Sequence, residues 1–281
     1  MSASPISNVS DTARWVAVYR AWESARPDAL FHDPYAELLA GERGHAIAAV
    51  MPRQARNGWP LIARTKLVDD IVQTAIAGGC NGVLNLAAGL DTRPYRLKLP
   101  ASLEWIEADL PAIIEEKERL LASAQPRCRL RRIKVDLKDP AARVAMLREA
   151  PGPATQTLVI TEGLLVYLDD AEVRALAGDL LAEPNIRWWL IDLASPAIVK
   201  MMQQQMGAHL ANAPMKFAPP NGVGFFEAIG WKVADVWSIM GAAAKFRRLP
   251  WMLRLFAMLP DPDPRMLESA RWSGVVKLER T

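Results

Sequence analysis

Hydrophobic and polar positions alternate in blocks along the middle of the chain. Short runs of apolar and β-branched residues occur at 82–88, 103–109, 130–136, 157–163 and 186–194. In the segments 111–121 and 169–182 between them, apolar residues recur at helical spacing. Strands that alternate with helices predict an α/β fold, in which a mostly parallel, doubly wound sheet carries helices on both faces. Ligands of such sheets bind beyond the carboxyl ends of the strands.

The segments on either side of this alternating region differ from it. The first eighty residues have mainly helical patterns, and the segment 60–79 reads as a long amphipathic helix that ends at Gly78-Gly79. The segment 195–264 is less regular, and 271–280 alternates like a closing strand. Trp188 and Trp189 would point to opposite faces of a central strand, which makes both of them core residues.

The stretch "RRLPWMLRLFAMLPDPDP" at 247–264 is unusually apolar. We expect it to form a short helix, and a helix that is apolar on all sides is usually buried. The preferred interpretation is therefore a packed cap over a pocket. The alternative is a segment that binds a membrane interface.

Composition narrows the class of protein. The 281 residues are 51% hydrophobic, enough for a large core, and the net charge of +3 does not indicate a nucleic-acid partner. Cys80 and Cys128 form no CxxC motif, so neither a disulfide framework nor a zinc site is expected. The polar N-terminus and the lack of a long apolar run favour a cytoplasmic protein, for which membrane contact is not expected.

Chemistry-bearing residues stand at the ends of the predicted strands. Gly89, Asp109, Asp136 and Glu162 follow four successive strands and should meet at one edge of the sheet. Any one acid there could simply cap a helix, but four residues in register make that explanation weak. Asp109 lies 20 residues after Gly89, the spacing at which an acid reaches a ribose diol in nucleotide-binding folds.

The loop after the first strand does not look like a phosphate site. It has the single glycine Gly89, and Pro94 should keep Arg93 out of the helical conformation, so no helix is expected to begin at once. A nucleoside without phosphates fits such a loop better. S-adenosylmethionine is the leading candidate.

Four motifs carry a resemblance to a known family. "NLAAGLDTRPYRL", "EADLP", "VDLKD" and "TEGLLVYL" occur in this order. Together they resemble the leucine carboxyl methyltransferase family and its bacterial S-adenosylmethionine-dependent relatives, several of which act on polyketides. The likeness extends over most of the chain and implies a Rossmann-like class I methyltransferase fold.

The resemblance also implies roles for two arginines. Arg64, in "ARTKLVDD", would bind the cofactor carboxylate, because a guanidinium group can bind a carboxylate through two parallel hydrogen bonds. A basic residue of the N-terminal helix would assist it, and Arg20 fits better than Arg14 because it lies shortly before "DPY". A solvated helix face is an equally good interpretation of Arg20.

Further cofactor contacts follow from the resemblance. Gly89 would contact the methionine portion, Asp109 the ribose diol, Asp136 with Leu137 the adenine ring, and Glu162 the amino group. These contacts would place the reactive sulfonium of S-adenosylmethionine over the ends of the strands.

Three more residues complete the expected site. Asp91 and Arg93 should brace the loop, as a local ion pair, rather than touch the ligand. Tyr167 is the candidate catalytic residue, which would orient the acceptor, although packing is at least as good an explanation for it. No metal site is expected, and a carboxylate acceptor would need no general base because it is ionised at neutral pH.

The sequence therefore predicts one methyltransferase domain over residues 1–281. Its parts are a helical segment (1–80), a cofactor-binding core (81–194), an acceptor cap (195–264) and a closing strand (265–281). The expected reaction is O-methylation of a carboxylate or hydroxyl of a small metabolite or natural product, including a carrier-bound group or a peptide terminus. The alternatives are a non-catalytic module that binds S-adenosylmethionine and a nucleotide-dependent oxidoreductase.

Overall fold

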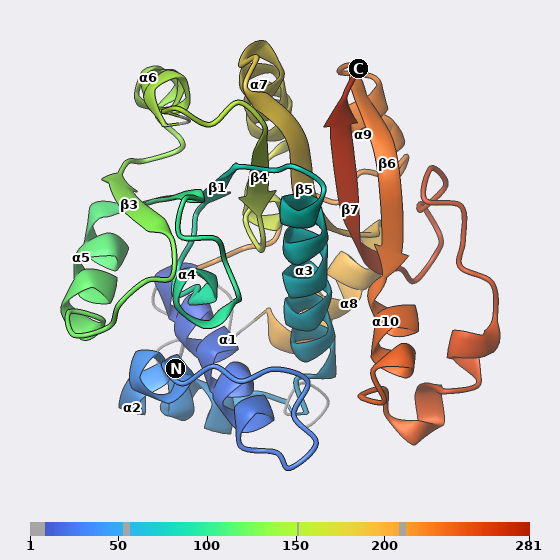
Figure 1. Ribbon diagram of the computed structural model, residues 1–281. Helices are drawn as coiled ribbons and strands as arrows, with labels where there is room; N and C mark the ends of the chain where they lie inside the picture. Colours follow the sequence, from blue (N-terminus) through green and yellow to red (C-terminus); the bar gives the residue numbers. More distant parts are fainter. Residues whose placement is uncertain (1–8, 53–56, 151, 208–211) are drawn as a thin grey trace.

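A single seven-stranded sheet forms the centre of the molecule (Figure 1). The computed structural model describes residues 9–52, 57–150, 152–207 and 212–281. The strands are β1 (Gly82–Leu86), β2 (Glu104–Asp109), β3 (Arg129–Lys134), β4 (Thr157–Thr161), β5 (Ile186–Ala194), β6 (Trp231–Ser238) and β7 (Ser273–Arg280), in the spatial order β3-β2-β1-β4-β5-β7-β6. Strands β1 to β5 pair in parallel, and β7 is antiparallel to both β5 and β6. The predicted Rossmann-like α/β fold is confirmed.

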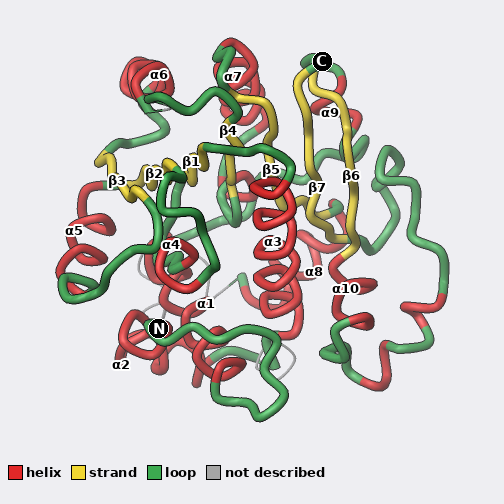
Figure 2. The backbone as a smooth tube through the Cα atoms, viewed as in Figure 1, coloured by secondary structure: helices red, strands yellow, loops and turns green. Residues whose placement is uncertain are grey.

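Helices connect the parallel strands and cover the sheet (Figure 2). The α-helices are α1 (Val9–Ser24), α2 (Ala36–Val50), α3 (Trp59–Ala77), α4 (Arg93–Arg96), α5 (Pro111–Leu120), α6 (Pro140–Glu149), α7 (Asp170–Ala182), α8 (Pro196–Met206), α9 (Gly224–Glu227) and α10 (Ile239–Lys245). The short 3₁₀ turns are η1 (Leu165–Tyr167), η2 (Trp251–Leu253) and η3 (Phe256–Met258). Among the described residues, no helix combines the length and the apolar character that crossing a bilayer requires.

Local signals set several helix ends. Asp169 and Glu172 form a reciprocal capping box at the start of α7, and Asp139 accepts the first free N–H groups of α6. Helix α3 ends at Gly78, as its glycine pair predicts. These caps give α6, α7 and α3 defined ends next to the strands they connect.

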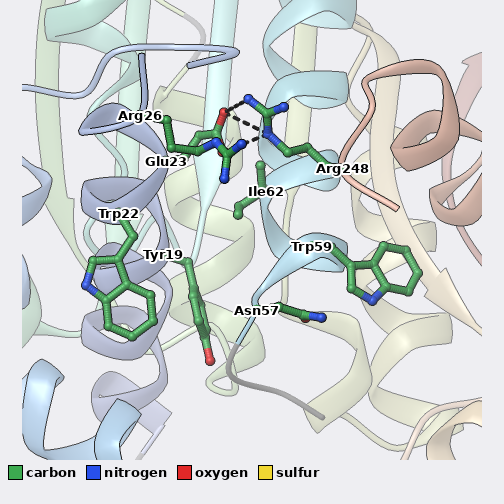
Figure 3. Close-up of a pocket in the computed structure, with 8 residues that line it drawn as sticks. All are labelled: Tyr19, Trp22, Glu23, Arg26, Asn57, Trp59, Ile62 and Arg248. Atoms are coloured by element: carbon green, nitrogen blue, oxygen red, sulfur yellow. Dashed lines mark hydrogen bonds and ion pairs between the residues drawn. The ribbon is translucent and has the colours of Figure 1, made fainter. Parts of the chain in front are cut away.

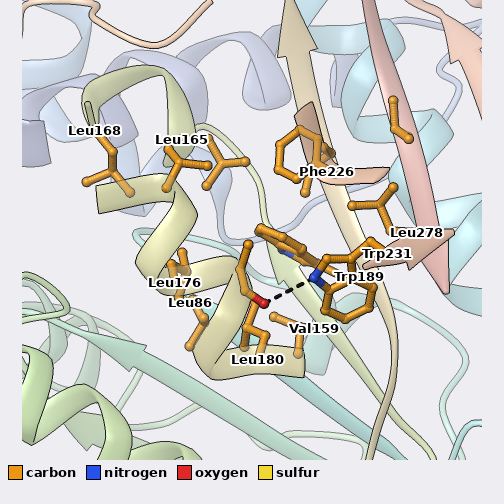
Figure 4. Packing of buried hydrophobic residues seen from close by; sticks show 14 of the residues in the cluster. Leu86, Val159, Leu165, Leu168, Leu176, Leu180, Trp189, Phe226, Trp231 and Leu278 are labelled. Atoms are coloured by element: carbon orange, nitrogen blue, oxygen red, sulfur yellow. Dashed lines mark hydrogen bonds between the residues drawn. The ribbon is translucent and has the colours of Figure 1, made fainter. Parts of the chain in front are cut away.

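The core lies on both faces of the sheet. Trp189 is fully buried on the face covered by α6, α7 and α9, while Trp188 packs on the opposite face with α3 and α10. The prediction that these neighbouring tryptophans point to opposite sides is confirmed. Figure 4 shows Trp189 beside Trp231, whose indole N–H donates to the Ala177 carbonyl and holds β6 against α7.

A third apolar cluster lies over the carboxyl ends of the parallel strands. It joins residues of α1, α2, α5, α8 and the turn η1, among them Tyr19, Leu39, Ile114 and Val199. The N-terminal helices therefore cover the edge of the sheet where ligands of such folds bind.

The segment 195–264 is not one cap, and this part of the domain prediction is wrong. It contains β6, which pairs with β7 along the edge of the sheet, as well as α8 and α10. Helix α10 packs on α3 and lies against the sheet rather than over a pocket. The run "WKVADVWS" alternates with period two, which is the signal that could have identified β6.

The expected buried helix at 247–264 is also wrong. The chain there forms only the turns η2 and η3, and Trp251, Leu255 and Phe256 are largely exposed. Pro250 and Pro260 limit any helix to residues 251–259, and there the backbone forms two separate 3₁₀ turns in place of one helix.

Candidate active site

The loop after β1 has an unusual backbone. Ala87 and Gly89 both have positive φ angles, of 52° and 49°. This conformation costs alanine about 1–2 kcal/mol, and such strain tends to occur at ligand-binding sites. A Cβ on Gly89 would come within 3.2 Å of the Ala13 Cβ, so glycine lets α1 lie directly over the loop.

Asp109 is tied to this loop. Its carboxylate accepts the Gly89 N–H at 2.7 Å and the Leu110 N–H at 2.7 Å. Burial raises the pKa of Asp109, although both backbone N–H groups act to lower it. The predicted juxtaposition of Gly89 and Asp109 is therefore present, and the contact of Asp109 with a ribose stays a prediction.

Arg93 is the centre of a buried charge cluster. Its guanidinium group contacts Asp91 at 2.7 Å, Asp69 at 2.7 Å and Glu162 at 2.9 Å. The predicted pair of Asp91 and Arg93 is confirmed. Burial acts to raise the pKa of Asp91, but the charges of Arg93, Lys117 and Arg96 together outweigh burial and hold the pKa well below its usual range.

The expectation that no helix begins near Pro94 is wrong. Arg93 is the first residue of the short helix α4, and Pro94 occupies its first turn. Proline is tolerated there because the first N–H groups of a helix have no intrahelical partner. The helical turn directs the Arg93 side chain back toward Asp69 of α3.

Arg64 and Glu162 lie together at the end of β4. Arg64 Nε donates to Glu162 at 2.9 Å, and Arg64 Nη1 donates to Asp192 of β5 at 2.6 Å. Asp192 also accepts the Gly163 N–H at 2.8 Å. Burial acts to lower the pKa of Arg64, but the charges of Asp192 and Glu162 outweigh it and raise the pKa. Contact of Arg64 and Glu162 with a cofactor remains a prediction.

Glu162 should contribute to stability in a pH-dependent way. Burial acts to raise the pKa of its carboxyl, but Arg93 and Arg64 outweigh burial and lower the pKa. A carboxyl whose pKa is lower in the folded state stabilises the fold above its unfolded pKa, about 4.3, and this contribution is lost as the pH falls through the folded value. We expect the Tm difference between the wild type and Glu162→Gln to be largest near pH 7 and to shrink below about pH 4. A difference that stays constant between pH 7 and pH 3 would contradict this assignment.

Arg20 is not on a solvated helix face. It is buried, and it donates to Asp33 at 2.9 Å and to the Leu90 carbonyl at 2.6 Å. Arg14 instead pairs with Glu116. The choice of Arg20 over Arg14 therefore identifies the arginine that holds the β1 loop, while its contact with a cofactor carboxylate stays a prediction.

The two residues predicted to hold the adenine lie beyond β3. Asp136 is exposed and accepts the Lys138 N–H at 2.9 Å. The Leu137 carbonyl accepts from Arg143 at 2.7 Å. The Val135 N–H donates to the Asp109 carbonyl, so this turn begins beside the tip of β2. The turn at 135–138 lies beside Asp109, as expected, and its contact with an adenine ring stays a prediction.

Tyr167 lies in η1, between the strand ends and α1. Burial raises the pKa of its phenol, although a hydrogen bond with Thr12 and the charge of Arg64 act in the opposite direction. At neutral pH the hydroxyl is therefore protonated. The Tyr167 ring packs against the apolar cluster over the strand ends. A packing role does not conflict with the predicted role of its hydroxyl in orienting an acceptor.

A cavity of about 320 Å³ lies between α1 and the start of α3 (Figure 3). Tyr19, Trp22 and Trp59 form its aromatic walls. At one end, the buried Glu23 carboxylate pairs with Arg248 at 2.7 Å. The walls belong to the same two helices that carry Arg20 and Arg64 to the strand ends.

Sequence reasoning missed three polar residues of the site. Asp192 lies within the apolar run of β5, Asn85 within that of β1, and Asp69 on the buried side of α3. Asn85 donates to Asp91 at 2.8 Å. A polar side chain inside an apolar run needs a buried partner, and this is the signal that could have revealed them.

Comparisons with known proteins identify a family and relatives for this chain. A family model described as leucine carboxyl methyltransferase matches residues 13–180. A protein of Mycolicibacterium smegmatis, named "Putative S-adenosyl-L-methionine-dependent methyltransferase", is 32% identical over 81% of this chain and 84% of its own. A Streptomyces coelicolor protein with the same description is 36% identical over 81% of this chain and 84% of its own.

The fold is shared with solved structures. The crystal structure of a DUF574 family protein from Streptomyces avermitilis superposes with a TM-score of 0.58, at 17% identity, over 96% of this chain and 97% of that one. The matched family region runs from α1 to α7 and includes the loop after β1 and the ends of β2 and β4. This chain belongs to the leucine carboxyl methyltransferase family.

Proposed function

We propose that this protein is an S-adenosylmethionine-dependent O-methyltransferase that methylates a carboxylate of a small organic molecule. The family and the relatives' names support methyl transfer from S-adenosylmethionine. The observation that carries the proposal is the joint placement of Gly89 with Asp109 and of Arg64 with Glu162 at one sheet edge under α1. These residues would hold the cofactor's ribose and its methionine end.

The charge state of the site supports a carboxylate acceptor. Glu162 is held ionised by two arginines and is therefore a weak base, whereas the Tyr167 phenol keeps its proton. A hydroxyl acceptor would need a base to remove its proton, while a carboxylate is already a nucleophile at neutral pH. Tyr167 would orient that carboxylate by donating a hydrogen bond. Methyl transfer then depends mainly on alignment with the sulfonium.

The cavity beside Tyr19 and Trp59 is the proposed acceptor pocket. Its volume lies at the lower end of the range for small-molecule sites, and its aromatic walls suit an apolar or aromatic body. Tyr19 precedes Arg20 on α1, and Ile62, which also lines the cavity, lies two residues before Arg64 on α3. The cavity therefore shares helices α1 and α3 with the predicted cofactor site, although Tyr19 and Ile62 point to other sides of these helices than Arg20 and Arg64 do.

Transfer of a labelled methyl group tests the function. The protein should move tritium from methyl-labelled S-adenosylmethionine to acidic small molecules in a metabolite extract, and mild base should release the label as methanol. Base-stable label would indicate a hydroxyl acceptor and contradict the carboxylate assignment. Tight cofactor binding without transfer would favour a non-catalytic module, and a preference for NAD in calorimetry would favour an oxidoreductase.

A further inference from the structure

The segment between α10 and β7 exposes an unusual amount of apolar surface. Seven large hydrophobic side chains there are between 58% and 79% exposed: Trp251, Met252, Leu255, Phe256, Met258, Leu259 and Met266. We call the part at 251–259 the apolar loop. In Figure 1 it lies at the lower right, away from the sheet. Contiguous exposed apolar patches on folded proteins usually mark an interaction site.

The apolar loop is fixed to the body of the protein at its start. Leu249 is buried in the cluster formed by α3 and α10, and Leu253 and Ala257 pack against the same cluster. Arg248 binds Glu23 at 2.7 Å and Asp28 at 3.2 Å. Because Leu253 and Ala257 face the body of the protein, Trp251, Leu255 and Phe256 point to solvent. The folded protein therefore exposes these three side chains.

Positive charge predominates beside the apolar loop, although the exposed Asp261 and Asp263 follow its last residue. Residues 236–260 contain Lys245, Arg247, Arg248 and Arg254 and not one aspartate or glutamate. Arg248 is engaged with Glu23, while Lys245, Arg247 and Arg254 are exposed. The surface therefore combines protruding tryptophan, phenylalanine and leucine side chains with a cationic rim.

We propose that the apolar loop docks on an anionic phospholipid surface. Trp251, Leu255 and Phe256 would enter the boundary between headgroups and acyl chains, and the three exposed cations would contact lipid phosphates. Apolar burial and attraction to anionic lipid together give the two signals that stable peripheral binding needs.

A second copy of the chain fits this surface less well. In a symmetric dimer the same patch faces itself, so the exposed cations of both copies would lie in one interface. Like charges at an interface oppose association. The preference for a packed cap over a membrane-binding segment at 247–264 rested on a buried helix, and the exposed side chains remove that basis.

Co-sedimentation with vesicles tests the proposal. The full chain should bind vesicles of phosphatidylcholine and phosphatidylglycerol (roughly 7:3) at least about tenfold more tightly than pure phosphatidylcholine, and salt should weaken binding. Trp251→Ser with Phe256→Ser should reduce binding by at least about tenfold. Arg247→Glu with Arg254→Glu should abolish the preference for anionic lipid.

Leu38→Ser is the matched control, because Leu38 is exposed to a similar extent but lies on α2, outside the apolar loop. It should bind vesicles as the wild type does, and all variants should keep the wild-type Tm because their side chains are exposed. Failure of the wild type to bind anionic vesicles would overturn the proposal, as would full binding by the double serine variant. Light scattering could instead show that the wild type is a dimer and that the double serine variant is a monomer. This result would assign the surface to a second copy of the chain. The test does not depend on the proposed methyl transfer.

Discussion

Replacing Arg93 by methionine should lower the free energy of unfolding by about 3–5 kcal/mol, the cost of breaking a buried ion pair from one side. Arg93 is 3% exposed and is the common partner of Asp91, Asp69 and Glu162. Without it, three carboxylates share a buried region with less positive charge to compensate them. Urea denaturation monitored by circular dichroism measures the loss.

Arg129→Met is the matched control for this prediction. Arg129 pairs with Glu104 at 3.1 Å, but its side chain is 65% exposed, so its loss should cost about 0–1 kcal/mol. Arg93→Lys should recover only part of the stability, because lysine cannot serve three carboxylates with a planar fork of donors. Equal stability of Arg93→Met and the wild type would show that the cluster contributes no net stabilisation.

Asp109→Ala should weaken binding of S-adenosylmethionine by roughly 10- to 150-fold, corresponding to about 1.5–3 kcal/mol for hydrogen bonds to a charged group. The predicted role of the carboxylate is to accept from a ribose diol, and in the structure it accepts the Gly89 N–H of the β1 loop. The variant loses both functions. Isothermal titration calorimetry measures the change in Kd.

Asp109→Asn separates the two functions of this side chain. Its amide oxygen can still accept the Gly89 N–H, but the negative charge and one acceptor are lost, so its affinity should lie between those of the wild type and Asp109→Ala. Unchanged affinity in a folded Asp109→Ala protein would remove this residue from the site.

Much of the fold was predictable because its signals are local. Runs such as 82–88 and 186–194 alternate with helical segments, and this order alone implies parallel strands whose carboxyl ends meet at one edge. The opposite orientations of Trp188 and Trp189 follow from the two-residue period of a strand. Gly89 and Asp109 were found from their spacing, and the structure places them in hydrogen-bonding contact.

The exposure of the apolar loop could not be predicted, because composition does not say which surface is left over once the core is complete. The sequence 251–259 is apolar enough for a core, yet α10 and Leu249 already fill the space on that side of the sheet. The strand β6 occupies the edge position beside β7, and α10 and Leu249 complete the core there, so Trp251, Leu255 and Phe256 stay outside it. Burial is decided by competition among all segments for a limited core.

By itself, the sequence determined the order of the parallel strands along the chain, the residues at their carboxyl ends and the family of the protein. Only the tertiary structure decided the long-range ion pairs: Arg64 meets Asp192 across 128 positions of sequence. Arg93 contacts Asp69 and Glu162 in addition to its predicted partner Asp91. Periodicity and spacing express interactions between near neighbours in the chain. Ion pairing depends on distances of a few ångströms between segments that only the folded sheet and its covering helices bring together.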